Sequence, residues 1–307
     1  MAGPFRGSPG TRNTRAVTLG LRHRRTTLLL GSVAIVGFAT SHALEVGLRM
    51  AFRTRRRPAV TDAAPSVWLT TTGGKRLAAR YVAPRHDDGA VVLVIHGWGG
   101  SSADMDVAAH SLSANGLGVL LVDARCHGDS DDDDFASMPR FAEDIEVGLE
   151  WLTTFGVTPD RVVLLGHSVG AGAALLVASR RRVAGVIALA CMAHPAEMMT
   201  AMMVRKRIPL SVVRLVLWKM QRLLGQRFDS FAPVHTIAAV PCPVLLLHGD
   251  ADTTVPVADA QRLRHASNGG ARLVIVEGAD HQSADAFLQH ADMVVAFVDE
   301  CLSSRAG

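Results

Sequence analysis

The sequence contains few cysteines and few aromatic residues, and its cysteines do not form pairs with metal-binding spacing. Only four of its 307 residues are cysteine, and only 5% are Phe, Trp or Tyr. Cys126, Cys191, Cys242 and Cys301 lie far apart without a CxxC motif, which argues against a zinc or redox site. We therefore expect buried thiols, with one disulfide as the alternative if the domain is exported.

Acidic residues are nearly absent from the first 57 residues, which contain eleven arginines and one glutamate. This segment has a net charge of +10, whereas the whole chain has +4, so residues 58–307 carry −6. Because the main part of the chain is mildly acidic, nucleic-acid binding has no electrostatic support. A hydrophobic content of 49% with 20% charged residues excludes a disordered chain. The length allows one large α/β domain with an appendage.

The N-terminal part is predicted to consist of a disordered basic leader at 1–25, a hydrophobic segment at 26–52 and a basic linker at 53–65. The uncharged run from Thr26 to Leu44 can span a bilayer at roughly 1.5 Å per residue. We predict a single-pass anchor and a membrane-associated protein. A cleaved signal ending near Ser41-His-Ala43 and a twin-arginine export signal at Arg24-Arg25 are the alternatives. Positive charge on both flanks leaves the side of the membrane open.

From Ser66 onward, short apolar runs alternate with segments of helical character. The predicted strands are Ser66–Thr72, Arg76–Val82, Ala90–Ile95, Gly118–Asp123, Arg161–Leu165, Val183–Ala190, Val244–Leu247 and Arg272–Val276. The predicted helices cover residues 103–115, 138–155, 171–178 and 284–302. This alternation predicts an α/β fold in which a mostly parallel sheet has helices on both faces. Ligand sites in such sheets lie at the carboxyl ends of the strands.

A glycine-flanked serine follows one of these strands, in the motif Gly166-His-Ser-Val-Gly170. Strand, sharp turn and Ala-rich helix form the context that a nucleophile elbow requires. Glycines suit this context because the turn is strained and the helix passes close to the strand. The hydroxyl of Ser168 would then lie at a helix N-terminus, where backbone N–H groups favour a developing oxyanion.

Further polar residues follow three other predicted strands. The loop His96-Gly-Trp-Gly-Gly100 can turn backbone N–H groups toward a ligand, His248-Gly-Asp-Ala-Asp252 offers two carboxylates, and Glu277-Gly-Ala-Asp-His281 offers an imidazole. The order is Ser168, then acid, then His281. One triad arrangement of serine hydrolases has this order, whereas those on other folds do not.

Residues 66–302 resemble the α/β-hydrolase superfamily, in its serine esterase and lipase-like branch. The matching motifs are His96–Gly100, Asp123–Ser130, Gly166–Gly170, His248–Pro256 and Gly278–His281. The resemblance implies the α/β-hydrolase fold, with Ser168 as nucleophile, His281 as base and Asp252 as the residue that orients it. It also implies an oxyanion hole made by the backbone N–H groups of Trp98 and Val169, and no metal or organic cofactor. Asp250 falls on a variable position of the motif.

An insertion at about residues 192–240 is predicted to form a short helical cap. It is rich in methionine and basic residues, and four of its apolar residues share one helical face, namely Val213, Leu217, Met220 and Leu224. We interpret it as a cover over an apolar acyl pocket, with Met198, Met202 and Leu217 as candidate substrate contacts. The alternatives are a helix pair that only packs on the core and a cap that rests on lipid.

The predicted function is that of a serine hydrolase that cleaves carboxylic esters of small molecules with an apolar acyl group, through an acyl-enzyme. A thioesterase or peptidase with the same triad is an alternative, because a triad does not specify the leaving group. A membrane-tethered binding module without activity is a further alternative. The acidic run Asp131–Asp134 is interpreted as a solvated loop.

Overall fold

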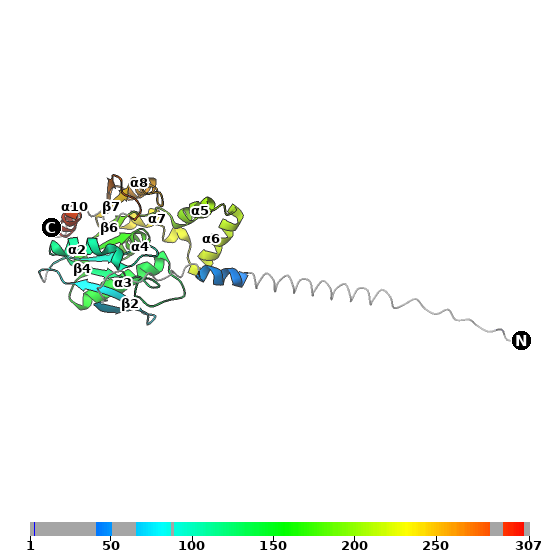
Figure 1. The fold of residues 1–307 in the computed structure, drawn as a ribbon, viewed down its shortest axis with the longest axis horizontal. Helices are drawn as coiled ribbons and strands as arrows, with labels where there is room; N and C mark the ends of the chain where they lie inside the picture. The colour runs from blue at the N-terminus through cyan, green and yellow to red at the C-terminus, as the bar shows by residue number, and fades with distance from the viewer. Residues whose placement is uncertain (1–2, 4–40, 51–65, 87–88, 283–290, 304–307) are drawn as a thin grey trace. The chain divides into compact units, whose positions relative to one another are not determined.

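The structure, a computed structural model, describes Gly3 and residues 41–50, 66–86, 89–282 and 291–303. The chain divides into two compact units, Met1–Leu48 and Arg49–Gly307. In the first unit, the described residues 41–48 are helical. The second unit contains every helix and strand that Figure 1 labels.

The predicted N-terminal segments lie mostly outside the described residues. Of the proposed anchor or signal at 26–52, only residues 41–50 are described, and of the leader and linker only Gly3. Within the described ranges, we find no helix with the length and apolar character needed to cross a membrane. The anchor therefore remains a prediction from the sequence.

One sheet carries the fold, and its order is β1-β2-β4-β3-β5-β6-β7-β8. Its strands are β1 (Val67–Thr70), β2 (Arg76–Val82), β3 (Val91–Ile95), β4 (Gly118–Val122), β5 (Val162–His167), β6 (Gly185–Leu189), β7 (Val244–Gly249) and β8 (Ala271–Val276). The pairs β1–β2 and β2–β4 are antiparallel, and all other neighbours are parallel. The predicted α/β-hydrolase fold, with its hairpin and mostly parallel sheet, is confirmed.

Helices cover both faces of this sheet (Figure 1). On one face lie α2 (Asp106–Ala114) and α10 (Ala291–Ser303), which contact each other and share one apolar core. On the other face lie α3 (Met138–Thr154), α4 (Val169–Ala178) and α8 (Val257–Ala266). The sequence analysis did not identify α8, whose only buried apolar residues are Ala260 and Leu263. A helix with so narrow an apolar face has a weak periodic signal.

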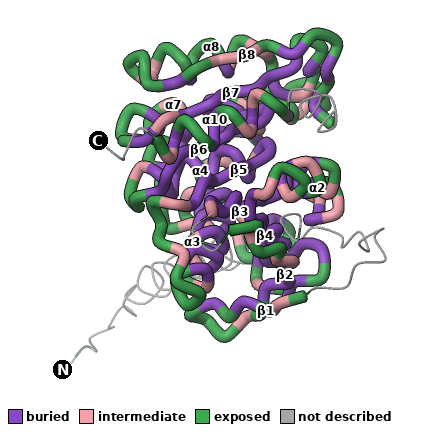
Figure 2. The backbone as a smooth tube through the Cα atoms, turned by 90° about the vertical axis from the view of Figure 1, so that its left-hand side faces the viewer, coloured by how far each residue is buried: buried purple, intermediate pink, exposed green. Residues whose placement is uncertain are grey.

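The central strands are buried on both sides, as the purple tube in Figure 2 shows. Along β3, Val92 and Val94 belong to the core beneath α2 and α10. The alternate residues Val91, Leu93 and Ile95 face the other side of the sheet. Successive side chains of a strand point to opposite faces, so a run of apolar residues fills two cores at once. The branched apolar runs of the sequence therefore reflect double burial.

The strand register brings the loops of interest to one edge of the sheet. Ile95 of β3 pairs with Gly166 of β5, and His167 pairs with Leu189 of β6. The segments that follow β3, β5 and β6 therefore leave the sheet side by side. The remaining elements follow β6 or connect strands: η1 (Ser102–Met105), η2 (Pro159–Arg161), α5 (Pro195–Arg205), α6 (Leu210–Leu224), η3 (Phe228–Ser230), α7 (Pro233–Thr236) and η4 (Ile237–Ala239).

All four cysteines are buried thiols, as the sequence analysis expected. Cys126, Cys191 and Cys301 are at most 2% exposed. Burial raises the pKa of the Cys191 thiol, and it also raises that of Cys126. A thiol with a raised pKa forms little thiolate at neutral pH, so Cys126 and Cys191 do not have the character of reactive thiols.

Candidate active site

Ser168 lies in a strained turn between β5 and α4. Its backbone has φ 53° and ψ −113°, a conformation that residues with a Cβ rarely adopt. A Cβ at Gly166 would come within 2.4 Å of the Gly170 carbonyl carbon, and a Cβ at Gly170 within 2.5 Å of the His96 carbonyl oxygen. Both flanking positions therefore exclude side chains, so the packing required of a nucleophile elbow is present.

The structure brings Ser168, His281 and Asp252 into one hydrogen-bonded chain. Nε2 of His281 lies 3.1 Å from Oγ of Ser168, and Nδ1 of the same ring lies 2.7 Å from Oδ2 of Asp252. The three residues come from the ends of β5, β7 and β8, and each is buried. Distances of this size suit proton transfer from a hydroxyl to an imidazole that a carboxylate holds in place.

Asp252 is held in the ionised form. Burial alone would raise its pKa, but hydrogen bonds from His281 and from the N–H groups of Val255 and Thr254 lower it below the ordinary value. Both of those N–H groups lie 2.8 Å from Oδ1, which leaves Oδ2 to the imidazole. Because an ionised carboxylate only accepts, Nδ1 of His281 carries the ring proton and Nε2 can accept from Ser168.

Asp250 is not part of the hydrogen-bonded series of Asp252, His281 and Ser168. Its Oδ1 accepts the N–H of Gly278 at 2.7 Å, so its side chain ties the β7 loop to the β8 loop. The two carboxylates thus have different hydrogen-bond partners in the structure, and the role of Asp252 as the residue that orients the base stays a prediction.

Comparison with known proteins is consistent with this geometry. Residues 91–297, two thirds of the chain, match the sequence profile of the alpha/beta hydrolase family. This chain belongs to that family. An uncharacterized protein of Mycobacterium tuberculosis strain H37Rv is 30% identical over 232 residues, which span 74% of this chain and 75% of that protein.

Two named relatives of this alpha/beta hydrolase act on esters. The sn-1-specific diacylglycerol lipase ABHD11 of Mus musculus is 37% identical over 91 residues, covering 29% of this chain and 28% of that protein. A solved esterase of Pyrococcus furiosus superposes with a TM-score of 0.63 at 20% identity, covering 81% of this chain and 97% of that chain. At that identity, the superposition establishes the fold alone.

The loop that carries Gly97 and Trp98 lies against Ser168 in this alpha/beta hydrolase. A Cβ at Gly97 would come within 2.7 Å of His167 Nδ1 and within 3.3 Å of Ser168 Cβ. Trp98 is the next residue in the chain, and it is 39% exposed. On the other side of Ser168, Val169 begins α4, and the first N–H groups of a helix have no acceptor within it. Val169 thus follows Ser168 directly in the chain, and Trp98 follows the glycine that lies against Ser168, while the oxyanion hole itself stays a prediction.

His96 holds this loop in place and was not assigned a role from the sequence. Its ring is fully buried, Nδ1 donates to the carbonyl of Gly97 at 2.7 Å, and Nε2 accepts the N–H of Ala124 at 3.1 Å. Burial lowers its pKa. The neutral ring thus joins the loops after β3 and β4.

His167 holds the loop that carries the candidate base and was also missed. Its Nε2 donates to the carbonyl oxygen of His281 at 2.9 Å. The serine motif by itself assigns no role to this position. It gains its role only because the β8 loop lies over the end of β5 in the folded chain.

A buried ion pair supports the loop after β4. Arg125 donates to Oδ1 of Asp144 through Nε at 2.9 Å and Nη2 at 2.7 Å. Complete burial raises the pKa of Asp144 to about 6, against the opposing charge and hydrogen bonds of Arg125. Asp133 lies 3.3 Å from Arg125 and 2.8 Å from Arg140. The acidic run predicted to be solvated is thus partly a partner for buried arginine, although Asp132 and Asp134 are exposed.

The predicted cap corresponds to α5 and α6, which pack against each other. Of the face predicted on α6, Val213 and Met220 are buried and Leu217 and Leu224 are partly buried. The predicted limits of 192–240 are wider than this helix pair, because α7 contacts α4 and α8 of the main domain. For a short apolar segment such as α7, the sequence does not show whether it packs on the cap or on the main domain.

The cap reaches the loop that carries Asp252. Arg205, at the end of α5, donates to the carbonyl of Thr253 at 3.1 Å. Among the candidate substrate contacts, Met198 and Leu217 are partly buried and Met202 is exposed. Their contact with a substrate remains a prediction.

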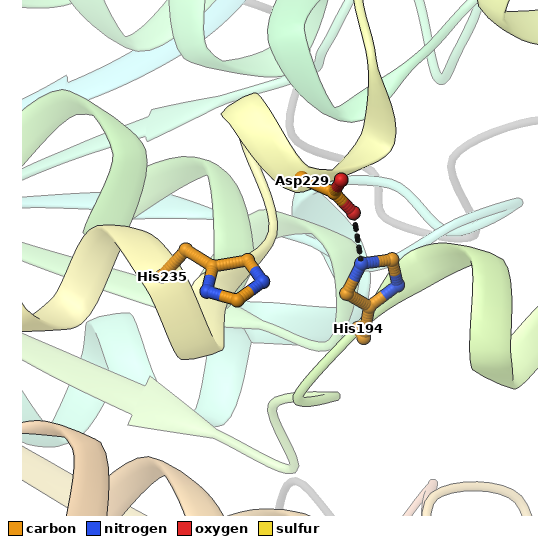
Figure 3. A group of neighbouring side chains, drawn as sticks. All are labelled: His194, Asp229 and His235. Atoms are coloured by element: carbon orange, nitrogen blue, oxygen red, sulfur yellow. Dashed lines mark hydrogen bonds and ion pairs between the residues drawn. The ribbon is translucent and has the colours of Figure 1, made fainter.

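Three residues at the base of the cap form a potential metal-ligand group that the sequence analysis did not anticipate (Figure 3). One ligand atom each of His194, Asp229 and His235 lies within 4.8 Å of the others. However, Nδ1 of His194 accepts the N–H of Ala196 at 3.2 Å, and Nε2 lies 3.2 Å from Asp229 Oδ1. In the neutral ring the proton is therefore on Nε2, where it donates to Asp229 and occupies the lone-pair direction that a metal needs. In this arrangement the group joins the two ends of the cap by a hydrogen bond.

We expect the free energy of unfolding to fall as the pH decreases from about 6.5 toward 4. Burial, assisted by His281, lowers the pKa of His167 to about 4, and burial, assisted by His96, does the same for His127. In this window the unfolded state binds the protons and the folded state does not. Each histidine therefore lowers the free energy of unfolding by up to roughly 3 kcal/mol as the pH falls through this window. Asp144, whose raised pKa makes the folded state bind a proton there, offsets about as much as one of them. Urea unfolding at pH 7.5, 5.5 and 4.5 measures the effect.

His127→Gln and His167→Gln are the controls for this pH dependence, and each is expected to flatten it. The ring of His127 is the sharper probe, because its Nε2 is buried with no hydrogen-bond partner in the described part of the chain. Equal free energies of unfolding at pH 7.5 and 4.5 in the unmodified protein would contradict the assignment.

Proposed function

We propose that the protein is a serine hydrolase that cleaves carboxylic esters through an acyl-enzyme on Ser168. The observation that carries the proposal is the hydrogen-bonded chain from Asp252 through His281 to the Ser168 hydroxyl, at 2.7 and 3.1 Å. A serine hydroxyl is a weak nucleophile until a neighbouring base removes its proton.

In the first half of the reaction, Ser168 Oγ attacks the ester carbonyl while its proton moves to Nε2 of His281. Asp252 stabilises the imidazolium that forms and keeps the ring in the tautomer with the proton on Nδ1. The N–H groups of Trp98 and Val169 donate to the tetrahedral oxyanion, and loss of one such donor costs roughly 3–4 kcal/mol in other hydrolases. The imidazolium then protonates the alcohol that leaves.

In the second half, a water molecule takes the place of the alcohol. His281 removes a proton from the water, the hydroxide attacks the acyl carbonyl, and the Ser168–acyl bond breaks. The proton returns to Ser168 Oγ and the carboxylic acid leaves. The residues named supply every proton transfer in this cycle.

We propose that the substrate is a small ester with an apolar acyl group. The support is the position of α5, whose residue Arg205 contacts the loop of Asp252, and the apolar side chains Met198, Met202 and Leu217 of the cap. Flexible methionines adapt to irregular apolar substrates. The ester preference is also supported by the esterase and the diacylglycerol lipase among the similar proteins.

The test is a matched series of esters, thioesters and aminoacyl amides of graded acyl length, assayed with the full chain. We expect turnover to be highest for the esters and to increase as the acyl chain lengthens from acetyl, since each buried methylene adds about 0.8 kcal/mol of binding. Faster turnover of the thioesters or amides would reassign the leaving group. No turnover of any compound, together with no labelling by a fluorophosphonate, would favour the binding-module alternative.

We also propose that the uncharged run from Thr26 to Leu44 anchors the protein in a membrane. The full-length chain should then sediment with membranes and resist carbonate extraction, whereas carbonate should release residues 58–307 into the soluble fraction, and these residues should keep their activity. Immunoblots of the two fractions measure the distribution. Full-length protein found entirely in the soluble fraction would contradict the anchor.

A further inference from the structure

The outward side of α6 carries apolar side chains that nothing in the described structure covers. Val213 and Met220 on the inner side are buried. In contrast, Leu210, Val212, Leu215 and Trp218 are between 44% and 55% exposed. We call these four residues the cap face. Three of them, Val212, Leu215 and Trp218, follow one another at a spacing of three, which aligns them along one side of the helix.

The segment around the cap face has charge of one sign only. From Met198 to Phe228 the chain contains seven Arg or Lys residues and no Asp or Glu, although residues 58–307 as a whole carry −6. Two of these cations stack on the exposed indole: the Arg222 guanidinium lies 5.1 Å and the Lys219 ammonium 5.5 Å from the Trp218 ring. The cap face is therefore an apolar strip bordered by positive charge.

We propose that the cap face is a docking surface for a membrane containing anionic phospholipid. Aliphatic side chains lose contact with water when they enter the acyl boundary, and Trp is favoured at the level of the headgroups. Lys and Arg beside it attract anionic headgroups. An acidic protein would match the charge, but it would not by itself account for four exposed apolar residues along one helix. This inference does not depend on the chemistry of Ser168.

The test uses the full chain reconstituted into vesicles whose lipids carry brominated acyl chains, which quench nearby tryptophans. One set contains phosphatidylcholine alone, and the other also contains phosphatidylglycerol. The signal of Trp218 is the difference between the unmodified chain and Trp218→Phe. We expect this signal to be quenched about twofold or more in the anionic vesicles, and to change little in the neutral ones. The predicted anchor would hold the chain in both sets, so the difference between them reports the cap.

Trp68 is the matched control for this fluorescence signal. It is 44% exposed and has the Arg76 guanidinium 4.8 Å from its ring, but it lies on the edge strand β1. The Trp68 signal, obtained with Trp68→Phe, is expected to show no difference between the two lipid sets.

A charge-matched pair of variants tests the electrostatic part. Replacing Lys206, Arg207 and Arg214 with Gln should weaken docking on the order of 100-fold, since each cation contributes about fivefold at an anionic surface. Replacing Arg180, Arg181 and Arg182 with Gln changes the net charge equally. It should leave docking unchanged, because these residues follow the C-terminal end of α4, where Arg180 and Arg181 pair with Glu146 and Glu150 of α3.

Three results would overturn the proposal. They are no quenching of Trp218 in anionic vesicles, equal quenching in both lipid sets, and equal weakening by the two triple variants. A shift of Trp218 emission with soluble poly-glutamate, without quenching by brominated lipid, would also overturn it in favour of an acidic protein. The fluorescence assay does not require enzyme activity. Ser168→Ala should therefore dock as the unmodified chain does, and the docking result stands even if the proposed esterase activity is wrong.

Discussion

Replacing Ser168 with Ala is expected to lower the kcat for ester hydrolysis by on the order of 10⁶-fold, as for removal of the nucleophile in other serine hydrolases. The reason is that Oγ of Ser168 is the atom 3.1 Å from the imidazole of His281. Labelling by a fluorophosphonate should disappear as well. The side chain is small and its loss leaves the backbone turn in place, so the melting temperature should change little.

Ser179→Ala, at the other end of α4, is the matched control for this experiment. Its hydroxyl donates only to the carbonyl of Leu176 at 2.7 Å, so both turnover and labelling should be retained. Normal fluorophosphonate labelling of the Ser168→Ala protein would place the nucleophile elsewhere.

Asp252→Asn is expected to lower the kcat by on the order of 10⁴-fold, as the equivalent change does in other triads. The amide keeps the size of the side chain but brings an N–H₂ group that can donate to His281. The ring is then stabilised with its proton on Nε2, and it can no longer accept the proton of Ser168. The imidazolium also loses its neighbouring negative charge. Measurement of kcat on one activated ester, with thermal melts to correct for folding, gives the effect.

Asp250→Asn is the paired variant, and it should affect stability more than chemistry. The carboxylate accepts the N–H of Gly278 and does not touch the imidazole, so the expected cost is of order 1 kcal/mol, similar to a lost cap. The kcat should stay near that of the unmodified protein. If Asp250→Asn is the strongly impaired variant, the assignment of the two carboxylates is wrong.

The strands and the main motifs were predictable because their signals are local. A run such as Val91–Ile95 is apolar at every position because both faces of the strand are covered. Positions 166 and 170 must be glycine because backbone atoms near Ser168 leave no room for a Cβ at either position. Similarly, Asp252 could be distinguished from Asp250 by its position in a short motif, and the structure brings Asp252 to His281.

Other features have no local signal. α8 was missed because it buries little apolar surface. His167, His96 and the group of His194, Asp229 and His235 were missed because each acts on residues that are distant in sequence. The packing of α7 on α4 and α8 also has no local signal, because it joins segments that are distant in sequence.

The sequence by itself determined the alternation of strands and helices, the glycine-flanked turn around Ser168 and the chain order of Ser168, Asp252 and His281. These depend on hydrophobic periodicity and on steric requirements over a few residues. Only the tertiary structure decided which partners meet across 113 residues, as Ser168 and His281 do at 3.1 Å. It also decided which side of α6 remains in contact with solvent. Such distances depend on strand register and on the packing of whole elements, which no short stretch of the chain encodes.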